Sequence, residues 1–197
     1  MAMQDIIVYV EVTLIVAIVL FIPFLWCRRK YLKHNDRWPV ASWKREAVLL
    51  SFVFYLICLY QITAFRFGGI GWSVENIISE QRVLNLEPLD QVWKWARNGY
   101  WSYIFYNVGG NCAWFIPLGI MVPAFFPNYR RFLKVVIVGT IVSYSIEVLQ
   151  YILCTGISDV NDIIFNAVGT GIGYIIFIPT YKLYEIYKYK KYGWVPK

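Results

Sequence analysis

The chain alternates between long apolar runs and shorter polar segments. Five of the runs are long enough to cross the apolar core of a bilayer as helices, given a rise of about 1.5 Å per residue. They cover residues 6–26, 47–65, 101–122, 135–154 and 161–178. The pattern predicts an all-α, polytopic membrane bundle of five transmembrane helices, forming a single integral membrane domain over residues 1–197.

The segment between the second and third runs, residues 72–100, has a different pattern. Pro88 divides it, and apolar or uncharged side chains recur at helical spacing on both sides of the proline. They are Val74, Ile77, Ile78, Gln81 and Leu84 before it, and Leu89, Val92, Trp93 and Ala96 after it. This favours amphipathic helices lying at the outer membrane surface. The alternative is an extracellular lid packed on the bundle.

Composition and charge agree with a membrane protein. Hydrophobic residues make up 59% of the chain and charged residues only 16%, which departs from soluble proteins. The net charge of +7 does not indicate nucleic-acid binding, because the positive charges are confined to segments between apolar runs. With the amino terminus outside, the cytoplasmic segments carry 15 of the 19 Lys and Arg residues. This predicts a multi-pass protein with its carboxyl terminus in the cytoplasm.

Cysteine and histidine usage gives no sign of a metal centre. The four cysteines are widely spaced and form no CxxC pair, and His34 is the only histidine. We therefore predict no cofactor and no histidine or cysteine metal cluster. A divalent cation held by carboxylates remains open. The pattern does not indicate an oligomeric state.

Polar residues gather in the outer halves of the apolar runs. Ionisable groups in membrane segments are costly, and they usually mark function or internal pairing. On the fourth run, Glu147 and Gln150 share one helical face, and on the fifth Asp162 and Asn166 do so. We expect one outward-lying polar layer. Its ligand-binding candidates are Arg66, Asn107, Asn111, Glu147, Gln150, Asp159, Asp162 and Asn166.

Structural explanations compete with a ligand site. Asn and Gln can connect helices by hydrogen bonds, and Glu147 could form an ion pair with Arg66. Gly169 and Gly173 make a small-xxx-small face of the kind that packs against another helix. The whole layer could therefore serve packing alone. However, three carboxylates with at most one nearby arginine exceed what packing requires.

These motifs resemble the VanZ-like family of bacterial membrane proteins. The resemblance covers residues 47–178, and Arg66 lies where the family often has arginine. The matching positions are Asn85-Leu86-Glu87-Pro88, then Asn111, Phe115, Pro117 and Gly119 with a further Pro123, then Glu147 and Gln150, and finally Asp159, Asp162, Asn166 and Gly169.

One short segment and one single position depart from the family pattern. Gly156, Ile157 and Ser158 stand where members often have an arginine before the first aspartate, and Glu87 occupies a usually apolar position. Arg66 is therefore the expected cation. The resemblance implies a bacterial cytoplasmic-membrane protein linked to resistance against teicoplanin and related lipoglycopeptides. It implies no established reaction.

Three functions fit these observations. The first is an envelope protein that sits in the lipid bilayer and binds an amphiphilic ligand, either a lipoglycopeptide or a lipid-linked wall precursor. The second is a membrane-embedded enzyme acting on a lipid-linked envelope substrate, with Glu147, Asp159 and Asp162 as candidate catalytic carboxylates. The third is a small transporter coupled to protons through Glu147.

Overall fold

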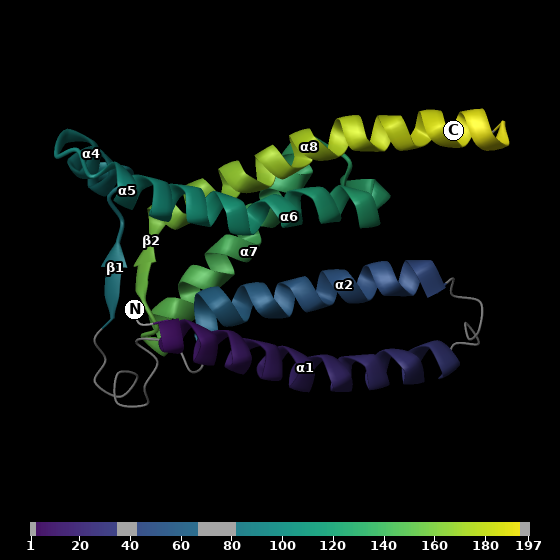
Figure 1. Ribbon diagram of the computed structural model, residues 1–197, viewed down its shortest axis with the longest axis horizontal. Helices are drawn as coiled ribbons and strands as arrows, with labels where there is room; N and C mark the ends of the chain where they lie inside the picture. Colours follow the sequence, from purple (N-terminus) through teal and green to yellow (C-terminus); the bar gives the residue numbers. More distant parts are fainter. Residues whose placement is uncertain (1–2, 35–42, 67–81, 194–197) are drawn as a thin grey trace. The chain divides into compact units, whose positions relative to one another are not determined.

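The computed structural model describes residues 3–34, 43–66 and 82–193 (Figure 1). These residues are helical except for turns and one two-stranded sheet. The chain divides into two compact units. Unit 1 comprises Met1–Leu84 and Ile146–Ser158, and unit 2 comprises Asn85–Ser145 and Asp159–Lys197.

Within the described ranges, five helical stretches are long and apolar enough to cross a membrane, which confirms the all-α polytopic fold. Each overlaps one predicted span. They cover Glu11–Tyr31, Glu46–Phe65, Trp101–Phe125, Phe132–Leu153 and Val160–Lys191. The first and last run beyond the predicted ends into basic sequence. Lys and Arg are good helix formers, and their long stems reach from an apolar segment to water, so the helix continues through them.

Unit 1 contains a pair of neighbouring helices, α1 (Met3–His34) and α2 (Trp43–Tyr60) (Figure 1). Two nitrogens of Arg28 donate to the two carboxylate oxygens of Glu46, each at 2.8 Å. This bidentate, charge-assisted contact ties the end of α1 to the first turn of α2. The rings of Phe21 and Phe54 pack edge to face, with centroids 5.8 Å apart. Both contacts fix the two helices against each other.

Two π-helical segments adjoin predicted site residues. The first, η1 (Gln61–Phe65), follows α2 and ends at Arg66, whose backbone N–H donates to the Gln61 carbonyl at 2.8 Å. The second, η2 (Phe105–Gly109), lies between α5 (Trp101–Ile104) and α6 (Gly110–Phe125). π-Turns are rare and frequently occur at functional sites.

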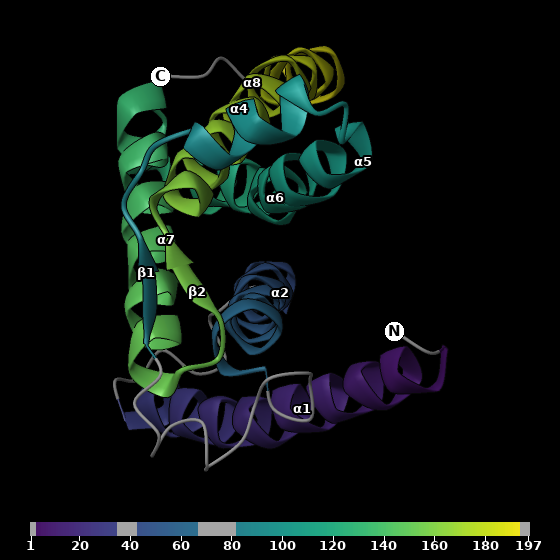
Figure 2. The same cartoon turned by 90° about the vertical axis from the view of Figure 1, so that its left-hand side faces the viewer.

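Unit 2 is organised around α6 and α8 (Val160–Tyr192), which run side by side (Figures 1 and 2). The two backbones approach so closely that a Cβ at Gly173 would overlap the Ile116 carbonyl oxygen. Likewise, a Cβ at Gly169 would overlap the carbonyl oxygen of Cys112. The predicted packing role of Gly169 and Gly173 is therefore confirmed. The short η3 (Pro127–Tyr129) then leads to α7 (Phe132–Leu153), which enters unit 1 at Ile146.

The segment before α5 differs in part from the prediction. Residues 67–81, which hold most of the first predicted amphipathic helix, lie outside the described residues. Its last position, Leu84, was predicted as helix and this was wrong: it lies in β1 (Val83–Asn85), which pairs with β2 (Ile157–Asp159) (Figure 2). Strand pairing with a distant segment overrides a local helical pattern.

The helix predicted after Pro88 is present as α4 (Asp90–Arg97). No residue of α4 is buried, and Lys94 forms an ion pair with Asp90. The hydrogen bond from Lys94 lowers the pKa of Asp90, and the same contact raises the pKa of Lys94. Both charges therefore persist at neutral pH on an exposed amphipathic helix, as a position at a membrane surface requires.

Candidate functional site

Arg66 and Gln150 meet at the end of η1 in unit 1. Nε of Arg66 donates to the Thr63 carbonyl at 3.1 Å, and Nε2 of Gln150 donates to the same oxygen at 2.9 Å. The last carbonyls of a helix have no intrahelical donors. These two side chains therefore satisfy the helix end, and the negative end of the helix dipole favours the Arg66 cation.

Thr155, in the turn after α7, completes this network. Its hydroxyl donates to the Ala64 carbonyl at 2.6 Å, and its own carbonyl accepts from Nη1 of Arg66 at 3.1 Å. A Cβ at the next residue, Gly156, would lie 3.3 Å from Nη1 of Arg66. The glycine therefore leaves the guanidinium uncrowded. Sequence reasoning missed Thr155, because one threonine in an uncharged loop gives no signal.

Two residues of this network have left-handed backbone conformations. Arg66 has a φ of 49° and Cys154 a φ of 51°. Such conformations cost non-glycine residues roughly 1–3 kcal/mol and persist where surrounding contacts hold them, often at functional sites. Thr155 follows Cys154 directly, and its carbonyl accepts a hydrogen bond from Arg66. This contact connects the two segments that contain the strained residues.

Glu147 and Gln150, on the part of α7 that belongs to unit 1, are each 4% exposed. Oε1 of Gln150 is buried and accepts no hydrogen bond in the described part of the chain. A buried acceptor without a donor costs about 1–3 kcal/mol. The described residues show no ion pair between Arg66 and Glu147. The structural salt bridge between them, which was one alternative to a ligand site, is therefore not formed in the described part of the chain.

In unit 2, Asn111 and Asp162 come together as the sequence predicts. Nδ2 of Asn111 on α6 donates to Oδ1 of Asp162 in the first turn of α8, at 2.5 Å. A turn deeper on α8, Nδ2 of Asn166 donates to the Ser143 hydroxyl at 2.8 Å. Oδ1 of Asn166 is buried and has no hydrogen-bond partner among the described residues. The amides thus connect α8 to both α6 and α7.

Asn107 does not join Asn111. Its side chain donates to the carbonyl of Tyr103 four residues earlier, at 2.8 Å, in an exposed position. This local contact connects η2 to a carbonyl of α5. The helical spacing that links Asn107 to Asn111 in the sequence is interrupted by the π-segment, which changes the residue spacing along the helix.

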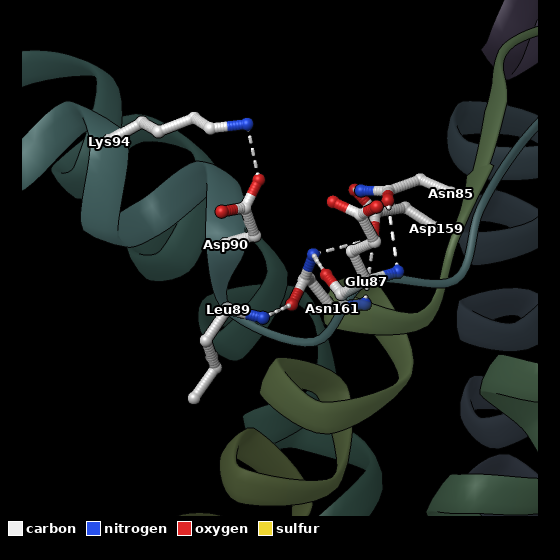
Figure 3. A network of polar contacts seen from close by, with 7 residues as sticks. All are labelled: Asn85, Glu87, Leu89, Asp90, Lys94, Asp159 and Asn161. Atoms are coloured by element: carbon white, nitrogen blue, oxygen red, sulfur yellow. Dashed lines mark hydrogen bonds and ion pairs between the residues drawn. The ribbon is translucent and has the colours of Figure 1, made fainter.

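Asp159 caps the start of α8 and anchors a network of polar contacts (Figure 3). Its Oδ1 accepts the backbone N–H and the side-chain amide of Asn161, both at 2.8 Å. Its Oδ2 accepts the amide of Asn85 at 3.0 Å. An aspartate that accepts the N–H two residues later is a helix N-cap. The geometry therefore gives Asp159 a structural role.

Two further residues of this cluster, Asn161 and Asn85, were not among the predicted site residues, although Asn85 stands in the motif that carries the family resemblance. The Asn161 side chain accepts the backbone N–H of Leu89 and donates to the carbonyl of Glu87 at 3.3 Å. Oδ1 of Asn85 accepts the N–H of Glu87 at 3.1 Å, forming an Asx turn. Asn85 stands three residues before Pro88, and a turn asparagine there was the available signal. Asn161 gave none.

The described side chains of these clusters offer hydrogen-bonding groups and the Arg66 cation. The described residues contain no group of three or more His, Cys, Asp or Glu side chains placed to hold a metal ion. Asp159 and Asp162 each accept amide hydrogen bonds within unit 2. In unit 1, Arg66 offers a charged donor, and Gln150 offers a buried acceptor.

Comparison with known proteins gives one match. The family model described as VanZ/LLP1 matches residues 52–183, about two-thirds of the chain and all of the predicted site residues. No curated protein and no solved structure matches the chain. The chain is thus a multi-pass membrane protein that belongs to the VanZ/LLP1 family, a family linked to glycopeptide resistance.

Proposed function

We propose that this chain is a bacterial cell-envelope protein that binds an amphiphilic ligand at the outer side of the cytoplasmic membrane. The distribution of Lys and Arg supports an orientation with the amino terminus outside and the carboxyl terminus in the cytoplasm. In that orientation, the ends of α2 and α7 that meet at Arg66 face outward. The start of α8 does so as well.

The observation that carries the proposal is the state of Arg66. Its guanidinium is fixed by bonds to the Thr63 and Thr155 carbonyls, which are neutral, and no ion pair to it is found among the described residues. A positioned arginine without a carboxylate partner is suited to a phosphate or carboxylate of a ligand. The buried Oε1 of Gln150, in the same network, would accept a ligand N–H or O–H.

The ligand class is proposed from the groups that each unit offers separately. A lipoglycopeptide such as teicoplanin, or a lipid-linked wall precursor, carries ionised groups, hydrogen-bonding sugar or peptide, and an acyl or prenyl chain. In unit 2, exposed Trp93, Tyr100 and Trp101 suit the boundary between chains and headgroups. The Asn111, Asp162 and Asn166 side chains add hydrogen-bonding groups to that unit.

Binding is favoured over carboxylate catalysis. Of the three candidate carboxylates, Asp159 is a helix cap and Asp162 accepts the amide of Asn111. Side-chain amides donate to both carboxylates, so these oxygens are engaged in hydrogen bonds between elements of unit 2. Glu147 lies one turn before Gln150 on α7 and is 4% exposed, and it is proposed to act through binding as well.

Resistance measurements with two charge-neutral variants test this proposal. We expect Glu147→Gln and Asp162→Asn each to abolish teicoplanin resistance in a susceptible host, with unchanged membrane insertion and protein level. Asp90→Asn, on the exposed α4, is the matched control and should keep resistance. If resistance survives both site substitutions, the proposal is refuted.

A further inference from the structure

A second polar site lies on the segment that joins α6 to α7 and on the first turn of α7. A depression of about 590 Å³ opens there, lined by Pro127, Asn128, Arg130, Arg131 and Lys134. Its lining contains three cationic side chains and no carboxylate. All five residues belong to unit 2, and the sequence orientation assigns this segment to the cytoplasm.

Arg130 is held rigidly beside this depression. Its Nε donates to the Pro123 carbonyl at 3.0 Å, and its Nη1 donates to the Tyr181 hydroxyl at 2.7 Å. The guanidinium also lies over the Tyr181 ring, 4.1 Å from the centroid. The Tyr174 hydroxyl donates to the Arg130 carbonyl at 3.0 Å. A cation fixed from α6 and α8 loses little conformational freedom on meeting an anion.

The other two cations are differently placed. Nζ of Lys134 donates to the carbonyl of Asn128 at 3.0 Å, and both residues line the depression. Arg131 is exposed, and neither it nor Lys134 forms an ion pair among the described residues. Glu185 lies beside the Tyr181 hydroxyl, and no ion pair joins it to Arg130 within the described part of the chain. Among the described residues of unit 2, the three cations of the depression thus form no ion pair.

The N-terminus of α7 makes the positive charge of Arg131 and Lys134 unfavourable unless an anion is present. α7 begins at Phe132 and has no acidic residue in its first turn. A helix N-terminus carries partial positive charge and N–H groups without intrahelical acceptors, so cations there are destabilising and anions are stabilising. Arg131 and Lys134 flank this terminus. A bound anion would offset both the charge of these cations and the partial positive charge of the helix N-terminus.

The location selects the kind of anion. The depression lies between the ends of two candidate membrane spans, Trp101–Phe125 and Phe132–Leu153. Exposed Phe126, Tyr129 and Phe132 are neighbours in sequence of its lining residues, and aromatic side chains are enriched at membrane–water boundaries. Basic pockets between transmembrane helices on the cytoplasmic side suit anionic headgroups. We propose that this depression binds the phosphodiester of an anionic phospholipid. Arg131 and Lys134 are the cations that contact the phosphodiester, and Arg130 is a third cation held in place beside them.

A titration with short-chain lipids tests this site. The detergent-solubilised full-length chain is titrated with short-chain phosphatidylglycerol, short-chain phosphatidylcholine or inorganic phosphate, and bound ligand is counted by native mass spectrometry. We expect phosphatidylglycerol to bind more tightly than either alternative. The double variant Arg131→Gln/Lys134→Gln should weaken it more than about tenfold, since each cation near an anionic lipid contributes about 1 kcal/mol.

The matched control is Lys188→Gln/Lys190→Gln, which removes the same charge from α8 away from the depression. It should leave phosphatidylglycerol binding within about twofold of the wild type, a change far below 1 kcal/mol. Equal losses in the two double variants, equal binding of the two lipids, or equally tight binding of inorganic phosphate would overturn the proposal. Arg130 is left unchanged, because its bonds to Pro123 and Tyr181 support the fold.

Discussion

Single residues in the polar clusters divide into those that hold the fold and those with groups left for a ligand. Asp159 belongs to the first kind, since its carboxylate accepts two donors from Asn161 and one from Asn85. Arg66 and Gln150 combine both kinds. Each caps a helix-end carbonyl, and each keeps bonding capacity beyond that contact.

Substitution of Asp159 separates capping from charge. Asp159→Ala should lower the free energy of unfolding by about 1 kcal/mol or more, because the cap of α8 is lost. Asp159→Asn should cost much less, because asparagine caps helices nearly as well as aspartate. Thermal unfolding in detergent measures both changes. If Asn is as destabilising as Ala, the negative charge of Asp159 is needed for stability and the capping account is wrong.

The sequence located these residues better than it located their partners. Asn111 and Asp162 could be placed at the outer ends of neighbouring helices, and they do bond. The contacts of Gln150 and Thr155 with the carbonyls of Thr63 and Ala64 could not be foreseen. They depend on where a helix ends and on a left-handed residue, and neither is encoded in side-chain periodicity.

At the scale of elements, unit 2 depends on the close approach of α6 and α8. Gly119 on α6 lies against Thr170 and Gly173 on α8, with no space for an added methyl group. Small residues let helix backbones approach in membranes, where packing and hydrogen bonds replace the hydrophobic effect as the driving force. The Asn111–Asp162 contact spans this same pair of helices.

Adding one methyl group at this contact should separate the helices. Gly173→Ala should destabilise the protein by about 1–3 kcal/mol, because its Cβ meets the Ile116 carbonyl and overpacking is costly. Gly110→Ala is the matched control, since nothing lies within 4 Å of its Cβ position. It should be neutral or slightly stabilising, because alanine favours helix over glycine. Equal unfolding temperatures for the two variants would contradict this packing.

Elements defined by periodicity were predictable, and elements defined by distant pairing were not. The five apolar runs and the amphipathic α4 follow from local pattern. The strand at Leu84 forms by pairing with β2, more than 70 residues later in the chain. The π-turns η1 and η2 also have no sequence signature, although they adjoin the residues of interest.

At the scale of the whole molecule, the VanZ/LLP1 match and five candidate spans define a multi-pass membrane protein. The distribution of positive charge along the sequence then leads to three separate proposals. Arg66 in unit 1 and the amide-rich contacts of unit 2 are each proposed to face outward. Arg130, Arg131 and Lys134 of unit 2 are proposed to meet anionic lipid.

The most direct test of the account is ligand binding by purified protein with Arg66 changed. The full-length chain in phosphatidylcholine nanodiscs is titrated with fluorescently labelled teicoplanin, and the dissociation constant is measured for the wild type, Arg66→Gln and Arg97→Gln. Arg97 is an exposed arginine of α4 and serves as the matched control.

The account predicts saturable binding that Arg66→Gln weakens at least about tenfold, as expected when a charge-assisted hydrogen bond worth 1.5–3 kcal/mol is lost. Arg97→Gln should bind like the wild type. Unfolding temperatures measured on the same samples distinguish lost binding from lost fold. Equal affinity of well-folded Arg66→Gln and wild type would contradict the central claim.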